Sequence, residues 1–133
     1  MRVIGLDANV LVRYLAQDDP TQSARATRLI ERELTDRDPG YVGLVVLVET
    51  CWVLKRLYGA SPAELRDTVR DLLDTRQLVV ERRSAVAAAL ARLGHDAGDM
   101  ADALVAECAS EAGCERTVTF DKSAVKLGMA LLR

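Results

Sequence analysis

The chain has 133 residues, of which half are hydrophobic and 29% are charged, and its formal net charge is −2. Its length is close to the commonest size of a single domain and is enough to bury roughly two-thirds of the unfolded surface. The near balance of charges excludes the strongly basic composition of a dedicated nucleic-acid-binding module. We therefore expect one globular domain over residues 1–133.

Neither the cysteines nor the apolar segments point to a secreted or membrane protein. The three cysteines (Cys51, Cys108 and Cys114) form no CxxC pair, which disfavours thiolate zinc ligation and indicates a reducing compartment. The longest apolar stretch covers residues 42–48, far fewer than the roughly 20 residues needed to span a bilayer. No charged segment followed by an apolar one opens the chain, so we expect no secretion signal. The sequence predicts a cytoplasmic protein with no membrane partner.

Short β-branched runs alternate along the chain with longer segments of helical period. In chain order we predict a strand at Arg2–Leu6, helices at Asn9–Leu15 and from Pro20 to about Leu34, a strand at Tyr41–Gly43, a mostly buried helix at Leu44–Tyr58, a helix from Pro62 to about Asp74, a strand at Leu78–Val80, helices at Ser84–Leu93 and from Asp99 to Gly113, a strand at Arg116–Phe120, a short helix at about Lys122–Leu127 and a strand at Met129–Leu132. This alternation implies a mainly parallel sheet with both faces covered by helices. The predicted fold class is α/β.

Several helix ends carry recognisable capping residues. Asp19 is a plausible N-cap, with Pro20 at the first helical position after it. Gly59 should close the helix before it, and the stretch from Ser61 to Glu64 has the pattern of a capping box.

Four acidic residues lie where the surrounding pattern is apolar or small. Asp7 and Asp121 each end a predicted strand, Glu49 interrupts a run of Val and Leu, and Asp102 opens a helix of small residues. An unpaired buried carboxylate is very costly. Four such residues in one chain therefore suggest that they share a cation.

Topology offers a reason for these carboxylates to meet. Functional groups gather beyond the carboxyl ends of parallel strands, where Asp7 and Asp121 should both project. Asp102 should lie near the same edge, because its helix runs back to the strand before Asp121, and Glu49 can join from a helix packed on the sheet. Mutual repulsion would raise the pKa values of such a group, and a hard divalent cation, Mg²⁺ or Mn²⁺, would relieve it. We therefore expect hydrolysis of RNA or DNA phosphodiesters.

Each acid also has a purely structural interpretation. Asp7 could cap the helix that starts near Asn9, and Asp121 could be a turn residue. Asp99 and Asp102 could be a cap and a first-turn acid favoured by the helix dipole. Glu49 is harder to explain structurally, because its helical neighbours are apolar.

Other candidate residues are weaker. The single histidine, His95, lies in a glycine-containing loop and is expected to be solvated rather than to act as a base. The face of Arg25, Arg28 and Arg32 is interleaved with glutamates and is expected to be solvated. Lys122 and Lys126 flank Asp121 and could hold a phosphate. Trp52 is expected in the core or at a subunit interface.

At this point the chain resembles the PIN-domain family, and within it the VapC-type ribonuclease toxins of bacterial toxin–antitoxin operons. The resemblance is carried by four stretches, at residues 6–15, 48–54, 99–106 and 119–121. Ala8 departs from the pattern, because many relatives carry Thr or Ser there, and a hydroxyl contact to the site is therefore missing.

The resemblance implies a three-layer α/β/α fold and a Mg²⁺- or Mn²⁺-dependent endoribonuclease that forms homodimers and is blocked by a cognate antitoxin. The positions of the family's metal site fall on Asp7, Glu49, Asp102 and Asp121, of which Asp7 and Asp102 are the principal ligands. Auxiliary roles fall on Asp99, Asn9 and Thr119, the last two orienting carboxylates or water. Arg13, Lys122 and Lys126 are candidate contacts to the RNA.

Two other functions are compatible with parts of the pattern. A phosphatase could use Asp7 as its nucleophile, but such enzymes carry a second Asp two residues later, where this chain has Asn9. A PIN-like scaffold could bind RNA or protein without catalysis, although all four acids are present. The sequence names no target RNA.

Overall fold

The computed structural model describes residues 2–94 and 98–133. Its elements in chain order are β1 (Ile4–Gly5), α1 (Ala8–Ala16), α2 (Pro20–Arg28), the π-helical turn η1 (Leu29–Glu33), β2 (Gly40–Val42), α3 (Leu44–Tyr58), α4 (Pro62–Asp74), β3 (Leu78–Val80), α5 (Arg83–Leu93), α6 (Met100–Glu111), β4 (Val118–Thr119), the 3₁₀ helix η2 (Lys122–Leu127) and β5 (Ala130–Leu131). The predicted order of strands and helices is confirmed, with β1, β4 and β5 shorter than expected.

The first three strands form a parallel sheet in the order β1-β2-β3. Ile4 pairs with Gly40, and Gly40 pairs in turn with Leu78. Each step from one strand to the next passes through helices, because parallel strands need a crossover connection. The expectation of parallel pairing is confirmed.

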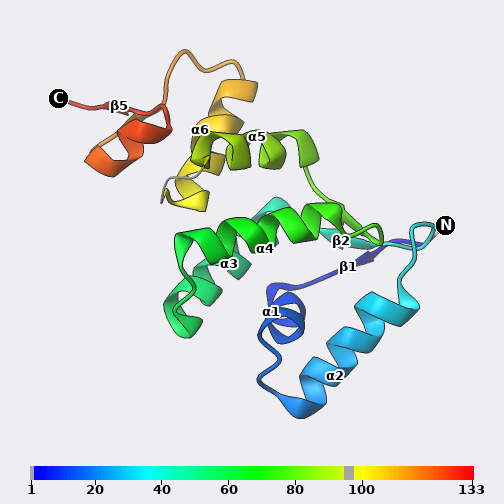
Figure 1. Ribbon diagram of the computed structural model, residues 1–133. Helices are drawn as coiled ribbons and strands as arrows, with labels where there is room; N and C mark the ends of the chain where they lie inside the picture. Colours follow the sequence, from blue (N-terminus) through cyan, green and yellow to red (C-terminus); the bar gives the residue numbers. More distant parts are fainter. Residues whose placement is uncertain (1, 95–97) are drawn as a thin grey trace.

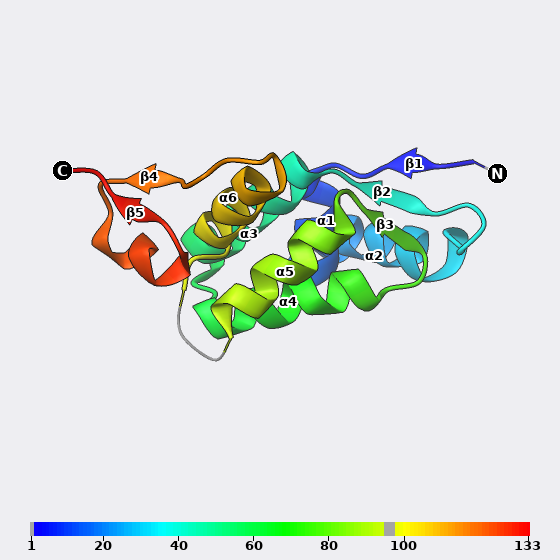
Figure 2. The ribbon, with the colours of Figure 1, turned by 90° about the horizontal axis from the view of Figure 1, so that it is seen from above.

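The last two strands form a separate parallel sheet, in which Val118 pairs with Ala130 on the far side of η2. Figure 2 shows β1 and β4 toward opposite ends of the molecule, with the N-terminus beside β1 and the C-terminus beside β4 and β5. The strands therefore do not share one carboxyl edge. The predicted central parallel sheet of an α/β/α fold is confirmed in β1, β2 and β3, and β4 and β5 form a second, smaller sheet.

Helices lie on both sides of the level of the three-stranded sheet. In Figure 1, α1 and α2 lie on one side of it, and α5 and α6 lie on the other. The face toward α1 and α2 carries Leu6, Val42 and Val80, all at most 5% exposed. On the opposite face Tyr41 and Val79 remain 36% and 46% exposed, because α5 and α6 pack over α3 and α4 rather than over the strands.

One continuous core joins these layers. Its largest fully buried apolar side chains come from α1, η1, β2, α3, α4 and α5, and they are Leu11, Ile30, Val42, Leu47, Val69 and Val86. Burying each of these side chains contributes roughly 1.5–3 kcal/mol. The core thus holds the starts of α1 and α3 in place, and those are the elements that carry Asp7 and Glu49.

The predicted caps are present. Asp19 accepts hydrogen bonds from the backbone N–H groups of Thr21 and Gln22, and Ser61 and Glu64 form a reciprocal capping box. Gly59 closes α3 with a φ of 66°, in the left-handed region that suits glycine.

Helix α3 is less buried than predicted. Its covered face carries Cys51, whose pKa burial raises to about 11. Its other face exposes Val45 by 80% and Trp52 by 56%, so Trp52 is not a core residue. The apolar composition of α3 predicted a mostly buried helix, but only one side meets the core. No helix in the described parts of the chain is long and apolar enough to cross a membrane.

Candidate active site

Three of the candidate acids close the N-termini of helices. Oδ1 of Asp7 accepts a hydrogen bond from the backbone N–H of Ala8 at 2.7 Å, at the start of α1. Asp99 accepts from the backbone of Asp102 at 3.1 Å, at the start of α6. Asp121 precedes η2 and accepts from both the backbone and the hydroxyl of Ser123, at 2.9 and 2.7 Å.

The capping interpretation is therefore confirmed for Asp7 and Asp99, and the turn interpretation for Asp121. It does not exclude a second role, since each cap engages only the Oδ1 atom. The other oxygen of Asp7 and that of Asp121 make no hydrogen bond within the described residues, whereas Oδ2 of Asp99 is engaged by Lys55. The caps also hold each carboxylate in one orientation.

Asp102 lies in the first turn of α6, half-buried, between two other acids. Burial raises its pKa above the usual range, and the negative charges of Asp99 and Asp121 raise it further. The Asp121 carboxylate behaves in the opposite way, because its hydrogen bonds from Ser123 lower its pKa. The charges of Asp99 and Asp121 thus both repel the ionised Asp102 carboxylate near the N-terminus of α6.

Lys55 partly offsets this negative charge. Its Nζ lies 3.4 Å from Oδ2 of Asp99, and its positive charge lowers the pKa of Asp102. Sequence reasoning missed Lys55, because a lysine in the last turn of a helix needs no explanation beyond the helix dipole. Only the packing of α3 against α6 brings Lys55 to the acids.

A small pocket of about 90 Å³ adjoins Asp99 and Asp102, and Lys126 from η2 forms part of its wall. Arg92 lies in the same wall, where it donates hydrogen bonds to Glu107 and to the backbone oxygen of Leu127. Lys126 thus stands where it could contact an anion beside the acids, as the sequence suggested.

The remaining residues beside Asp121 have different surroundings. Lys122 is exposed and makes no ion pair within the part of the chain that the structure describes. The hydroxyl of Thr119 accepts a hydrogen bond from the backbone N–H of Asp121 at 3.0 Å. It therefore shapes the turn that presents Asp121 rather than contacting the carboxylate.

Glu49 lies in a different hollow. A pocket of about 170 Å³ between α1 and α3 is lined by Glu49 together with Asn9, Arg13 and Tyr58. Glu49 is exposed to solvent, on the same helix as Val45 and Trp52. Glu49 is therefore not a buried carboxylate, and that part of the prediction is wrong. Its position beside Asn9 agrees with a site at the start of α1.

The four carboxylates do not form one compact group. Within residues 2–94 and 98–133, no three His, Cys, Asp or Glu side chains are close enough together to hold a metal ion. Asp102 is grouped with Asp99 and Asp121, whereas Glu49 lies with Asn9. The convergence predicted from strand order is wrong for this structure, because Asp7 and Asp121 follow strands of two different sheets. The assignment of the four as ligands stays a prediction, and His95 lies outside the described residues.

A comparison with protein-family models matches the PIN domain over residues 4–128. The chain belongs to the PIN-domain family, whose members are generally nucleases. A search of curated proteins finds no match. The family match agrees with the α/β fold, the parallel strands and the acidic residues at the starts of helices.

Proposed function

We propose that this protein is a metal-dependent endoribonuclease that hydrolyses RNA phosphodiester bonds. The observation that carries the proposal is the state of Asp102, whose pKa is raised by burial and by the nearby Asp99 and Asp121. Carboxylates held together at such a disadvantage are typical of functional sites. Family membership supplies the reaction class, a nuclease.

The donor set fits Mg²⁺ or Mn²⁺. Asp7, Asp99 and Asp121 keep one oxygen outside their capping bonds, and hard divalent cations prefer oxygen ligands. A cation would also relieve the repulsion that acts on Asp102. When bound, such an ion activates water and stabilises the oxygens that gain charge at the scissile phosphate.

The chain's own residues have distinct roles in this proposal. Asp7 and Asp102 hold the cation, with Glu49 and Asp121 completing the set. Lys126 neutralises a phosphate at the acidic pocket, and Asn9 positions water or a carboxylate at the other side. Because the two groups of acids lie in separate pockets, RNA and cation together would draw them toward each other on binding.

We further propose that the chain is the toxin of a VapBC-type pair, working as a homodimer and blocked by a cognate antitoxin. The exposed apolar face of α3 supports a protein partner, because Val45 and Trp52 are 80% and 56% exposed and line one apolar hollow with Leu44 and Val48. Large apolar side chains that cluster on a surface mark interaction sites.

The direct test compares cleavage of structured RNA by wild type and Asp7→Asn, with Mg²⁺, with Mn²⁺ and with a chelator. We expect the wild type to cleave RNA only when metal is present. The cleavage rate of Asp7→Asn should be lower by roughly 100-fold or more, because a catalytic metal site stabilises the transition state less well once a ligand has lost its charge. Asp67→Asn, an exposed change on α4, is the matched control and should cleave normally. Cleavage in the chelator, or full activity of Asp7→Asn, contradicts the proposal.

A further inference from the structure

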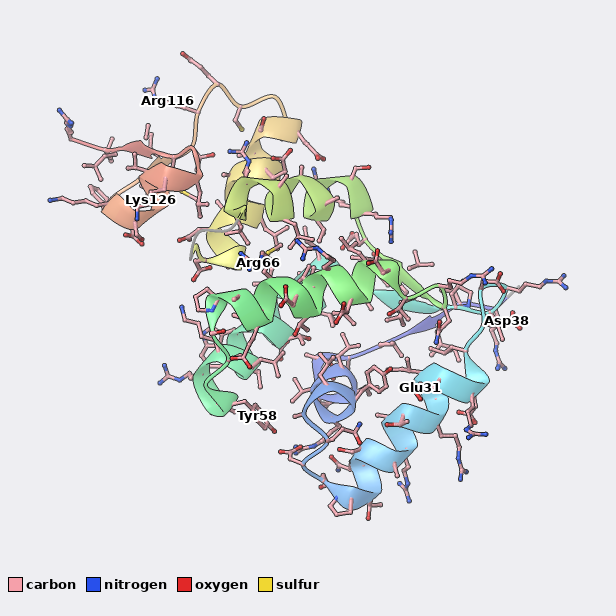
Figure 3. The ribbon with its side chains drawn as sticks, viewed as in Figure 1. Glu31, Asp38, Tyr58, Arg66, Arg116 and Lys126 are labelled. Atoms are coloured by element: carbon pink, nitrogen blue, oxygen red, sulfur yellow. The ribbon has the colours of Figure 1, made fainter. Side chains whose placement is uncertain are left out.

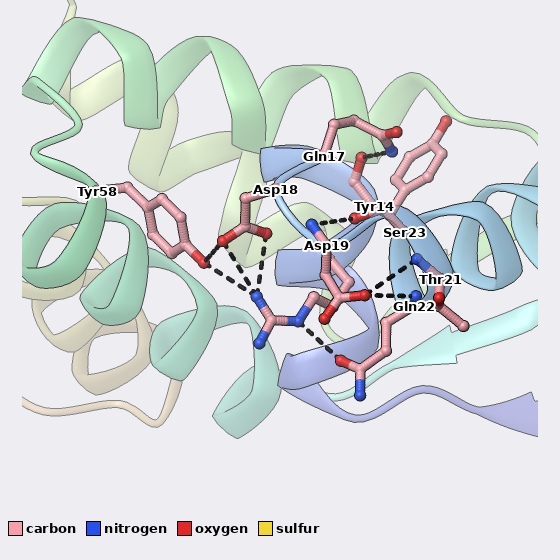
Figure 4. Close-up of polar contacts among 9 residues, drawn as sticks. Tyr14, Gln17, Asp18, Asp19, Thr21, Gln22, Ser23 and Tyr58 are labelled. Carbon is pink, nitrogen blue, oxygen red and sulfur yellow. Dashed lines mark hydrogen bonds and ion pairs between the residues drawn. The ribbon is translucent and has the colours of Figure 1, made fainter.

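The side chain of Arg13 makes polar contacts with three other segments. Their residues, Asp18, Gln22 and Tyr58, are labelled in Figure 4. Its Nε donates to Oε1 of Gln22 on α2 at 2.9 Å. Its Nη1 donates to the carboxylate of Asp18 at 3.0 and 3.2 Å and to the hydroxyl of Tyr58 at 3.2 Å. The guanidinium plane is therefore fixed relative to α1, α2 and the end of α3.

The same network keeps its groups charged. The Tyr58 hydroxyl donates to Asp18 at 2.5 Å and lowers the pKa of that carboxyl, while Asp18 raises the pKa of Arg13. Arg13 is thus a permanent cation with a fixed orientation. Its second terminal nitrogen, Nη2, takes part in no hydrogen bond within the described residues, so two of its five N–H donors remain free.

Arg13 forms one wall of a pocket of about 280 Å³ between α1 and α2. Arg25 forms another part of the rim, and the apolar side chains of Val10, Ala26 and Leu29 line the interior. None of the residues that line this pocket is acidic. Arg25 makes no ion pair within the described parts of the chain, so the rim presents two guanidinium groups to a ligand.

This pocket adjoins the one that contains Glu49. Asn9 and Arg13 line both, and they therefore stand between the Glu49 side of the candidate active site and the pocket with Arg25. A strand of nucleic acid that passes Glu49 would meet the two arginines next. Figure 3 shows Lys126 on the other side of the helices from Tyr58, so the acidic pocket on η2 is a separate location.

We propose that the α1–α2 pocket binds a backbone phosphate of the RNA next to the scissile bond. Arg25 and the free nitrogen of Arg13 contact the phosphate, since a guanidinium offers paired donors that match its oxygens. Asp18, Tyr58 and Gln22 are positioning residues that hold Arg13. This inference rests on the proposed function, because only a nucleic-acid substrate carries a phosphate on each nucleotide of the strand that passes Glu49.

The structure therefore separates Arg25 from the other arginines of its helix. Sequence spacing put Arg25, Arg28 and Arg32 on one solvated face, but only Arg25 lines the pocket. Arg28 and Arg32 are exposed and serve as matched controls of the same charge.

The test measures binding of a fluorescently labelled RNA hairpin with single-stranded flanks, in chelator so that the RNA stays intact, across a range of salt concentrations. We expect Arg25→Gln to weaken binding roughly 3- to 10-fold and to lower the slope of log affinity against log salt by about 0.7–0.9. Arg28→Gln and Arg32→Gln should leave the slope unchanged. Arg25→Lys should keep the slope, because it keeps the charge.

The inference is overturned if Arg25→Gln binds RNA as tightly as the two control variants do. That result is also the one expected if the pocket binds the carboxylate of a peptide instead of RNA. Because cleavage plays no part in this measurement, its result is independent of the proposed hydrolysis. RNA binding that depends on Arg25 without cleavage would sink the proposed function alone, and cleavage without dependence on Arg25 would sink the subsite alone.

The positioning residues have their own readout. Tyr58→Phe removes one contact to Arg13 and one to Asp18, and we expect it to raise the KM for RNA roughly two- to fivefold with little change in kcat or melting temperature. A purely structural role for the network predicts a lower melting temperature with KM unchanged, and that outcome contradicts the positioning role.

Discussion

Two groups of charged residues differ in how their charges are arranged. They are the Arg13 corner (Arg13, Asp18 and Tyr58) and the Asp102 corner (Asp102, Asp99, Asp121 and Lys55). Around Arg13, each charge has an opposite partner, and the contacts push the pKa values of Arg13 and Asp18 toward their charged forms. Around Asp102, like charges face one another, and its pKa moves toward the neutral form. At the first corner the chain itself supplies the opposite charges, whereas at the second burial and repulsion outweigh the attraction of Lys55.

This difference indicates which ligand each corner would attract, an anion beside Arg13 and a cation beside Asp102. Among the described residues, Lys55 is the cation that lowers the pKa of Asp102, and it is opposed by burial and by Asp99 and Asp121. The proposed cation site rests on this imbalance around Asp102.

The largest expected effect comes from removing the charge at the unbalanced corner. Asp102→Asn should lower RNA cleavage roughly 100-fold or more, because it removes a charged ligand of the cation. The same change should leave the melting temperature in chelator equal to or above that of wild type, since it also removes repulsion. Cleavage assays and thermal melts measure the two effects, and a marked fall in melting temperature would contradict the comparison.

The next largest effect is expected from removing the ion pair between Asp18 and Arg13. Asp18→Asn removes the negative partner of Arg13 and weakens its fixed orientation, so we expect the KM for RNA to rise roughly 3- to 10-fold while metal dependence is retained. Asp19→Asn, the neighbouring helix cap, is the matched control, since an amide oxygen can still accept the capping bonds. A loss of metal-dependent turnover without a change in KM would show that the two corners are not separate.

A smaller effect distinguishes capping from metal binding at a single residue. Asp7→Ala loses the cap of α1, and we expect the free energy of unfolding in chelator to fall by about 1 kcal/mol. Asp7→Asn keeps an accepting oxygen and should lose less, although both variants should lose cleavage. Denaturant unfolding measures the difference, and equal losses of stability in the two variants would argue against the cap.

The smallest effect concerns pH. The pKa of Asp102 is raised in the folded protein, so its protonated form stabilises the fold at low pH, and that stabilisation is lost as the pH rises through the raised value. In chelator, any advantage of Asp102→Asn over wild type in melting temperature should therefore be largest near neutral pH. It should shrink as the pH falls through the carboxyl range. A difference that does not depend on pH would rule out this electrostatic cause.

Local features were predictable from sequence because they depend on neighbouring residues. The capping box of Ser61 and Glu64, the cap at Asp19 and the glycine that ends α3 all follow from interactions within one turn. The bounds of α3 and β3 were predicted to the residue, since glycines flank α3 and polar residues flank the apolar run of β3.

Features that depend on distant pairing were not predictable. Strand order alone placed Asp7 and Asp121 at one edge, but β4 pairs with β5 rather than with β1. The contact of Tyr58 with Asp18 joins residues 40 positions apart, and nothing in either local sequence indicates it. The exposure of Glu49 was missed because an apolar helix can be covered on one side only.

The capping carboxylates link the folding of the first helical turns to occupancy of the site. One oxygen of Asp7 and one of Asp99 already hold the starts of α1 and α6. A cation on the free oxygen of Asp7, or one that replaces Lys55 at Asp99, would bind the folded caps better than the frayed ones, and so would stabilise the folded chain by mass action. Amide hydrogens in the first turns of these two helices should then exchange more slowly as Mg²⁺ or Mn²⁺ is added. Amide exchange at these helix ends would therefore detect metal binding without any RNA cleavage.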